Sequence, residues 1–113
     1  MQAGDIVRVD FGIPRGSEPG FVRPAVVVTA DQVLAAQTRT LHVVPITSNV
    51  TRGLPTEIHI DADVGGVTGM AQVHLCSVIS RSRITDDETS LNNVGAASLA
   101  QIRSVLGDLL DLP

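Results

Sequence analysis

The sequence predicts a mainly β domain of the α+β kind, in which short strands are followed by one C-terminal helix. Three observations lead to this prediction. Hydrophobic residues make up 43% of the 113 residues and charged residues 18%, a balance typical of a chain with a core. Several short apolar segments are separated by Gly- and Pro-rich stretches. Near the end, the apolar spacing changes to three and four residues. We expect a small twisted barrel or open sheet capped by a helix, with residues 1–113 forming one domain.

The first half of the chain predicts two strands joined by a long loop. Residues 4–11 alternate apolar and polar side chains, as a half-buried strand does. Residues 12–20 hold three Gly and two Pro in nine positions and therefore predict a loop. Residues 21–30 contain an unbroken valine run and predict a buried strand, with Pro24 at its start or on an edge. Residues 31–39 predict a helical turn or a loop.

The middle of the chain predicts three further strands. Residues 40–48 form the first, which we expect to break at Pro45, and a turn at 49–54 follows. Residues 55–60 form the second, with Glu57 and His59 on its polar side. After a loop at 61–69, residues 70–80 predict one continuous strand.

The last part of the chain predicts a charged segment and a helix. Residues 81–90 carry two arginines and three acidic residues. An amphipathic helix is expected over roughly 95–110, because apolar residues recur there at helical spacing. These residues are Leu99, Ile102, Leu106, Leu109 and Leu110.

Composition excludes several classes of protein. Aromatic residues are only 2% of the chain, which argues against a platform that stacks bases on rings. The single cysteine, Cys76, excludes an internal disulfide and a cysteine-cluster metal site. The N-terminus has no signal-peptide pattern and no run of 18 apolar residues exists, so we expect a cytoplasmic protein with no membrane segment.

The charges are distributed unevenly. All eight basic residues are arginines, and the net charge is −4, which argues against a general nucleic-acid coat protein. Residues 1–53 carry five Arg against four acidic residues, net +1, whereas residues 54–113 carry three Arg against eight, net −5. A phosphate site should therefore be local and drawn mainly from the first half.

Two patches carry candidate chemistry. In the first, the loop with Arg15, Ser17 and Glu18 leads to Arg23, whose guanidinium can grip a phosphate. In the second, Thr47 and Ser48 end an apolar strand and can offer hydroxyl and amide donors to an anion. Taken singly, each patch also fits an ordinary solvated loop or strand-end turn.

The histidines predict no metal site. His42, His59 and His74 have no zinc-ligand spacing, and each is expected to be an outward strand residue. The sequence also lacks a phosphate-binding loop and a dinucleotide fingerprint. We therefore expect neither a metal nor a cofactor.

Taken together and in order, GIPRGSEPGFVRPAVVVT, VVPITSN and GMAQVHLCSVISRSRI, followed by the helix, resemble the MazF/PemK/Kid family of toxin endoribonucleases. The resemblance covers nearly the whole chain. It implies an SH3-like barrel assembled as a homodimer. It also implies cleavage of single-stranded RNA at short sequences without a metal, and inhibition by a cognate antitoxin.

The resemblance also implies roles for individual residues. The arginine of the family's R-P motif falls on Arg23, the threonine of its P-I-T-S motif on Thr47, and its loop acid on Glu18. Attack by the substrate's own 2′-OH needs a base and donors for the charged phosphorane. Arg23 and Thr47 fit the donors, and Glu18 fits the base. The expected RNA-binding residues are Arg15, Ser17, Ser48, Asn49 and Arg52.

Two alternatives stay open, and a departure from the family pattern, together with the net charge of −4, favours the second of them. Ser77 stands where relatives often carry an arginine. A non-catalytic toxin of the CcdB kind, which shares the barrel, would act by binding a protein. A degenerate family member would survive as a dimeric binding module for an antitoxin.

Overall fold

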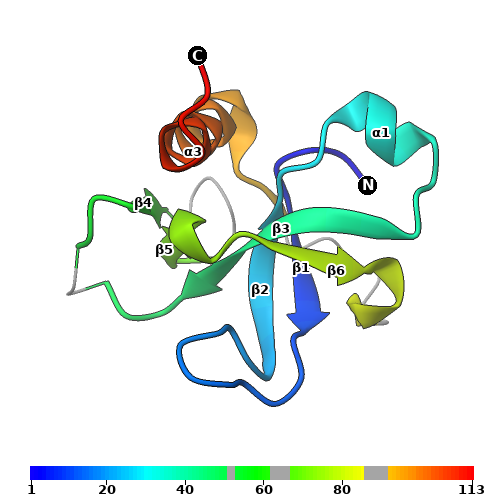
Figure 1. The fold of residues 1–113 in the computed structure, drawn as a ribbon, viewed down its shortest axis with the longest axis horizontal. Helices are drawn as coiled ribbons and strands as arrows, with labels where there is room; N and C mark the ends of the chain where they lie inside the picture. The colour runs from blue at the N-terminus through cyan, green and yellow to red at the C-terminus, as the bar shows by residue number, and fades with distance from the viewer. Residues whose placement is uncertain (51–52, 62–66, 86–91) are drawn as a thin grey trace.

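An antiparallel sheet of seven strands runs through the part of the chain that the computed structural model describes, residues 1–50, 53–61, 67–85 and 92–113. Its strand order is β4-β5-β3-β2-β1-β7, and β6 pairs with β3 outside that path (Figure 1). The strands are β1 (Asp5–Asp10), β2 (Val22–Val27), β3 (Thr40–Thr47), β4 (Glu57–Ile60), β5 (Gly69–Gln72), β6 (Ser77–Ser80) and β7 (Asn92–Asn93). The helices are α1 (Asp31–Ala35) and α3 (Gly95–Leu109), with short 3₁₀ turns η1 (Val73–Leu75) and η2 (Arg81–Arg83).

Strands β2 and β3 form the centre of the molecule and are buried on both faces. One apolar cluster takes Val26 and Val44 from these strands, and the cluster on the opposite face takes Val27 and Val43. All four side chains have no exposed surface. This explains why the valine run of the second strand is unbroken, since neither of its faces meets water.

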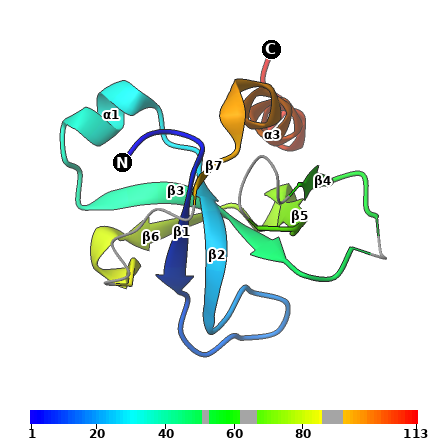
Figure 2. The ribbon, with the colours of Figure 1, turned by 180° about the vertical axis from the view of Figure 1, so that it is seen from behind.

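Each helix covers a different cluster. Ile102 of α3 is fully buried in the first, and Leu34 of α1 packs into the second. Both helices lie at one end of the sheet, and the loop of residues 11–21 lies at the opposite end (Figures 1 and 2). The predicted C-terminal helix is confirmed, but Leu109 and Leu110 are 45% and 60% exposed. Its buried face therefore ends before the helix does.

Asn93 joins the N-terminus to the start of α3. Its side-chain amide donates to the carbonyl of Ala3 at 3.1 Å and to the Asp5 carboxylate at 2.9 Å. Its Oδ1 accepts the backbone N–H of Gly95 at 2.8 Å, which satisfies a donor in the first turn of α3. The two-residue strand β7, which the sequence pattern did not predict, is the link between these parts.

The expected break at Pro45 is wrong. β3 continues through Pro45, which pairs with Ala25 of β2. On its other edge, β3 pairs with β6 over 40–43 and with β5 over 46–47. Pro45 lies between these two stretches, so its missing N–H removes no bond from either ladder.

The expectation of one strand over 70–80 is also wrong. The 3₁₀ turn η1 divides this segment into β5 and β6, which pair with different parts of β3. Val73 is fully buried although it lies in the turn. The turn carries apolar side chains because they pack into the core. In the sequence these side chains look like the apolar positions of a strand.

The expectation that Glu57 lies on a polar side of β4 is wrong. Its side chain is buried and only 7% exposed. Its Oε1 accepts the N–H of Leu54 at 3.0 Å, and its own N–H donates to the carbonyl of Leu54 at 2.9 Å. The two bonds close the turn before β4 and satisfy part of the buried carboxylate.

The bent sheet with its terminal helix confirms the mainly β small-barrel fold. Within the described residues, neither helix is long and apolar enough to cross a membrane.

We predict that Ile102→Ala lowers the free energy of unfolding by about 2–5 kcal/mol, because it leaves a cavity between α3 and the sheet. Urea unfolding measures the change. The control is Leu110→Ala at the C-cap of the same helix, which should change stability by less than ~0.5 kcal/mol because its side chain is exposed. Equal effects of the two substitutions would contradict this account of how α3 is held.

Candidate active site

The loop of residues 11–21 is closed by its own backbone. The N–H of Phe11 donates to the carbonyl of Phe21 at 2.9 Å, and the N–H of Phe21 donates to the carbonyl of Gly12 at 2.6 Å. A Cβ at Gly20 would overlap the ring of Pro14, so only glycine fits this position. The loop thus returns the chain to β2 directly before Arg23.

The register of β2 and β3 places Arg23 and Thr47 at the same end of the pair. Ala25 pairs with Pro45, and the β2–β3 ladder ends there, whereas the next residues of β3 pair with β5. If the ladder continued for two more residues, the same register would set Arg23 opposite Thr47, on the same face of the sheet. The two strands separate between these residues.

A pocket of about 220 Å³ opens where the strands separate, and it brings together three of the predicted site residues. Arg23 lines it from β2, and Thr47 and Ser48 line it from the end of β3. The other lining residues are Gly20, Phe21, Val22, Pro24, Ile46, Val67 and Thr68. No carboxylate is among the described residues that line it, so the charge of this pocket is positive.

The polar groups of this pocket are available to a ligand. Among the described residues, the half-buried Arg23 side chain makes no hydrogen bond or ion pair. Thr47 Oγ1 accepts the N–H of Asn49 at 3.3 Å, which leaves its hydroxyl hydrogen free to donate. A cation and a hydroxyl donor without a protein acceptor together suit an anion such as a phosphate.

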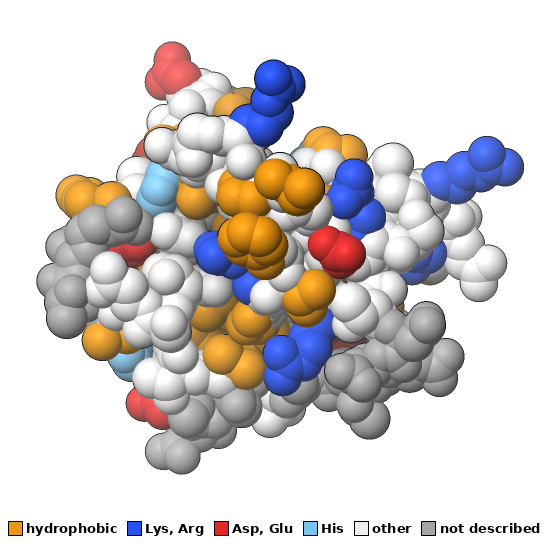
Figure 3. All heavy atoms as spheres, turned by 90° about the horizontal axis from the view of Figure 1, so that it is seen from below, with side chains coloured by type: hydrophobic (Ala, Val, Ile, Leu, Met, Phe, Trp, Pro, Cys, Tyr) orange, Lys and Arg blue, Asp and Glu red, His pale blue; other side chains and the backbone are white. Residues whose placement is uncertain are grey.

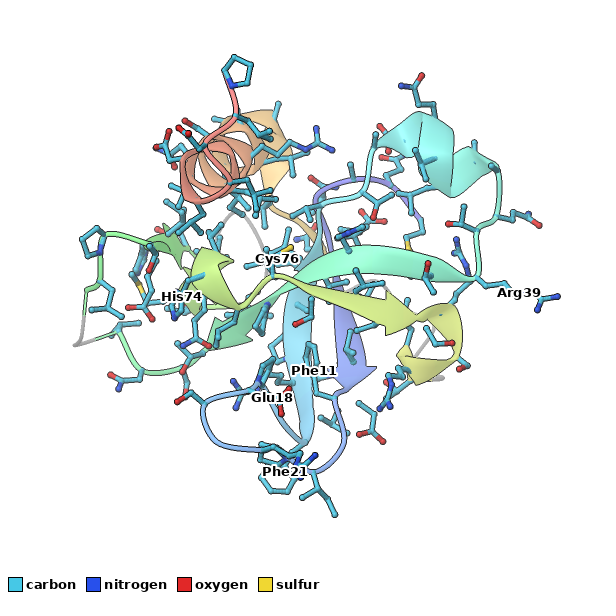
Figure 4. The ribbon with its side chains drawn as sticks, viewed as in Figure 1. Phe11, Glu18, Phe21, Arg39, His74 and Cys76 are labelled. Atoms are coloured by element: carbon cyan, nitrogen blue, oxygen red, sulfur yellow. The ribbon has the colours of Figure 1, made fainter. Side chains whose placement is uncertain are left out.

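Glu18 and Arg15 lie in a neighbouring pocket rather than with Arg23 and Thr47. This second pocket, of about 300 Å³, lies between the loop and β6, and Ser77 and Arg83 line its far side. The N–H of Glu18 donates to the carbonyl of Arg15 at 3.1 Å, so one turn fixes the backbone that carries both side chains. Figure 4 shows Glu18 close to Phe11, on the inner side of the loop.

The remaining predicted site residues are more scattered. Ser17 is exposed on the loop, and Asn49 is exposed after β3. Arg52 lies outside the described residues. The structure therefore supports one cluster around Arg23 and a second around Glu18.

Two residues, one lining the second pocket and one packed against Thr47, were missed as site residues in the sequence. Arg83 lines the second pocket, and its Nη1 donates to the carbonyl of Asp10 at 3.2 Å, next to the start of the loop. Gly69 of β5 lies against Thr47, where a Cβ would overlap the Thr47 carbonyl oxygen. Nothing in the sequence around Arg83 or Gly69 indicates these contacts. They arise only when segments that are distant in the sequence come together in the fold.

The histidines and the cysteine lie outside these pockets. His42, His59 and His74 are exposed, and His74 lies in η1, where its Nδ1 is 2.8 Å from Thr56 Oγ1. Burial raises the pKa of the Cys76 thiol, which disfavours the reactive thiolate. Within the described residues, no three His, Cys, Asp or Glu side chains are grouped so as to hold a metal ion.

Comparison with known proteins decides the family. The family model described as PemK-like, MazF-like toxin of type II toxin–antitoxin system matches residues 2–110. The chain belongs to this family. A relative from Mycobacterium tuberculosis named Endoribonuclease MazF9 is 36% identical over 118 residues, covering 99% of this chain and 98% of the relative.

Solved structures of MazF proteins have the same fold. MazF of Deinococcus radiodurans (Form-I) superposes with a TM-score of 0.83 at 31% identity, covering 99% of this chain and 97% of that one. A MazE–MazF structure of the same organism (Form-III) has a TM-score of 0.78 at 30% identity, covering 100% and 98%. The Arg23–Thr47 pocket is therefore set in a MazF-type barrel.

We predict that Gly69→Ala destabilises the protein by about 1–3 kcal/mol, because the added methyl group overlaps the Thr47 backbone. Urea unfolding should show the loss, and the backbone amide NMR signals of Thr47 and Ser48 should shift. The matched control is Gly107→Ala in α3, where the added Cβ meets only ordinary contact distance. Native stability and unmoved signals in Gly69→Ala would refute the contact.

Proposed function

We propose that this chain is the toxin of a type II toxin–antitoxin pair and cleaves single-stranded RNA, selectively for sequence and without a metal. The observation that carries the proposal is the pocket in which Arg23, Thr47 and Ser48 meet, with no carboxylate among the described residues that line it. Family membership and the relative named as an endoribonuclease support the same activity. A phosphodiester is the anion that such a pocket suits.

The proposed reaction uses the substrate's own 2′-OH. Its oxygen attacks the adjacent phosphorus, a P–O2′ bond forms, and the bond to the 5′-oxygen of the next nucleotide breaks. The products are a 2′,3′-cyclic phosphate and a 5′-hydroxyl. Because DNA lacks the nucleophile, the reaction selects RNA. The 2′ proton must pass to a base, and the leaving oxygen must gain a proton.

Arg23 and Thr47 act on the charge that develops at phosphorus. Arg23 donates to non-bridging oxygens and stays protonated, so we assign it electrostatic stabilisation rather than proton transfer. The Thr47 hydroxyl donates to a phosphoryl oxygen, and the adjacent Ser48 adds a further donor. The N–H of Asn49 bound to Thr47 Oγ1 orients that hydroxyl.

Glu18 is proposed as the base that takes the 2′ proton. It lines the pocket next to the Arg23 pocket, so the substrate strand must cross both. Arg15, in the same pocket, and Ser17, on the same loop, are proposed to bind the strand, as are Asn49 and Arg52.

The proposed partners follow from the fold and its exposed apolar surface. Phe21 and Val22 at the loop end are 66% and 53% exposed, and Val78 of β6 is 60% exposed. From below, hydrophobic side chains gather on this face with arginines around them (Figure 3). We propose that a second copy covers part of this face in a cytoplasmic homodimer, and that a cognate antitoxin blocks the groove. A structure of MazE with MazF supports the second partner.

We predict metal-free cleavage that depends on Arg23 and Thr47. With long single-stranded RNA in excess EDTA, the native protein should give discrete fragments. Thr47→Ala should slow cleavage about 10²- to 10³-fold, and Arg23→Ala by at least that, since each removes a transition-state donor. Gel analysis of the fragments measures the rates.

Two matched controls accompany these variants. Thr40→Ala changes an exposed threonine at the other end of β3, and Arg103→Ala removes an arginine from α3. Both should cleave at the native rate. A loss below tenfold for Arg23→Ala would refute its role, and intact RNA with native protein would favour a non-catalytic toxin.

We also predict that Glu18→Gln slows cleavage about 10²- to 10⁴-fold while RNA affinity stays near the native value, as expected for loss of a general base. Glutamine keeps the size of the side chain and removes its basicity. Single-turnover rates together with binding to a 2′-deoxy strand separate the two effects. A native single-turnover rate would show that another group takes the proton.

A further inference from the structure

A third pocket, which is basic, lies at the corner where the turn after α1 meets the end of β6. It has a volume of about 470 Å³ and is lined by Gln37, Thr38, Arg39, Ser80, Arg81 and Ser82. Thr40 pairs with Ser80, and the N–H of Arg81 donates to the carbonyl of Arg39 at 2.7 Å. The β3–β6 ladder thus sets two arginines, 42 positions apart in the sequence, side by side. We call this site the Arg39–Arg81 corner.

The guanidinium of Arg81 is held in place, and only part of it is hydrogen-bonded within the described residues. Its Nε donates to the carbonyl of Thr38 at 2.9 Å, whereas its Nη2 is buried without a hydrogen-bond partner. No carboxylate is among the described residues that line the corner. A half-buried cation that has no counter-ion among the described residues costs stability, which favours a role in holding an anion.

The other groups of the corner suit the same ligand. Ser80 Oγ and Ser82 Oγ lie 2.9 Å apart, and each can turn its hydroxyl toward an anion. Arg39 is exposed and projects from the molecule at this corner (Figure 4). Gln37 has a positive φ of 53°, an uncommon conformation for a residue other than glycine, and it directs the chain into this turn. Two guanidinium groups and two hydroxyls are the donors that a phosphate requires.

The corner and the proposed active site lie at the two ends of β3. Thr47 and Thr40 stand seven residues apart at the two ends of β3, about 23 Å at ~3.3 Å per residue. Between these ends, the pocket that holds Glu18 is lined by Arg15 and Arg83 as well as by β6. Each of the three pockets therefore contains at least one arginine, in a chain whose net charge is −4.

We propose that the Arg39–Arg81 corner binds a backbone phosphate of the substrate RNA, several nucleotides away from the bond that is cut. The inference rests on the proposed function and extends it. The active pocket and the corner hold the same strand at two points, so substrates long enough to reach the corner bind more tightly than short ones. The corner reads phosphate and not base, because its donors are guanidinium and hydroxyl groups.

The test measures binding of single strands of two lengths as a function of salt. Uncleavable 2′-deoxy oligonucleotides of about 4 and about 16 nucleotides keep the phosphates and remove the nucleophile. Arg39→Gln should weaken binding of the long strand roughly two- to fivefold and leave the short strand unchanged. The slope of log K against log salt should fall by about 0.7 for the long strand, as expected for one phosphate contact.

Two further variants keep the test decisive. Arg81→Gln should act in the same direction, and circular dichroism checks that it folds, because its Nε bond to Thr38 is lost. Arg103→Gln, which removes the same charge from α3, is the control and should change neither length dependence nor slope. Inorganic phosphate should compete with the long strand more weakly in Arg39→Gln than in native protein.

The outcomes separate this proposal from the proposed function. If native protein cleaves RNA but Arg39→Gln and Arg103→Gln bind the long strand alike, the corner is not part of the RNA path and this proposal is overturned alone. If phosphate competes but strand length has no effect, the corner binds a free phosphate and the proposal is again overturned. If native protein neither binds nor cleaves RNA, both proposals are overturned.

Discussion

The pairing of β2 with β3 is the constraint on which the rest of the structure depends. Its valines are buried on both faces and join the two apolar clusters, so the pair cannot shift register without exposing core residues. The same register sets Arg23 and Thr47 at one end of the pair. The candidate active site is therefore positioned by the most deeply buried part of the molecule, although its own side chains are partly exposed.

The candidate active site lies where β2 and β3, which are rigidly paired through the core, separate from each other. β3 leaves β2 after Pro45 and pairs with β5, whose Gly69 permits close approach to the Thr47 backbone. The gap becomes the Arg23 pocket, and the loop of residues 11–21 divides it from the pocket of Glu18. In the proposed mechanism, the rigid strands supply the charge stabilisation and the loop supplies the carboxylate. This division suits a reaction in which the substrate provides its own nucleophile.

Local sequence patterns correctly predicted the elements whose conformation depends on residues close in the sequence. Alternation predicted β1, the valine run predicted β2, and helical spacing predicted α3. The same patterns failed where packing overrides them. Pro45 stays within β3 because it lies between two partner strands, and Val73 fills the core from a 3₁₀ turn that resembled a strand. Glu57 is buried because a backbone N–H in the preceding turn satisfies its carboxylate.

The sequence by itself determined the fold class, the family and the residue types of the site, because the motifs around Glu18, Arg23 and Thr47 are local and ordered along the chain. Only the tertiary structure decided which of these residues share a pocket. Arg23 meets Thr47 through strand register, whereas Glu18 joins Arg15 and Arg83 across the loop. The Arg39–Arg81 corner arises in the same way. Its two arginines carry no common motif, and pairing between β3 and β6 alone brings them together.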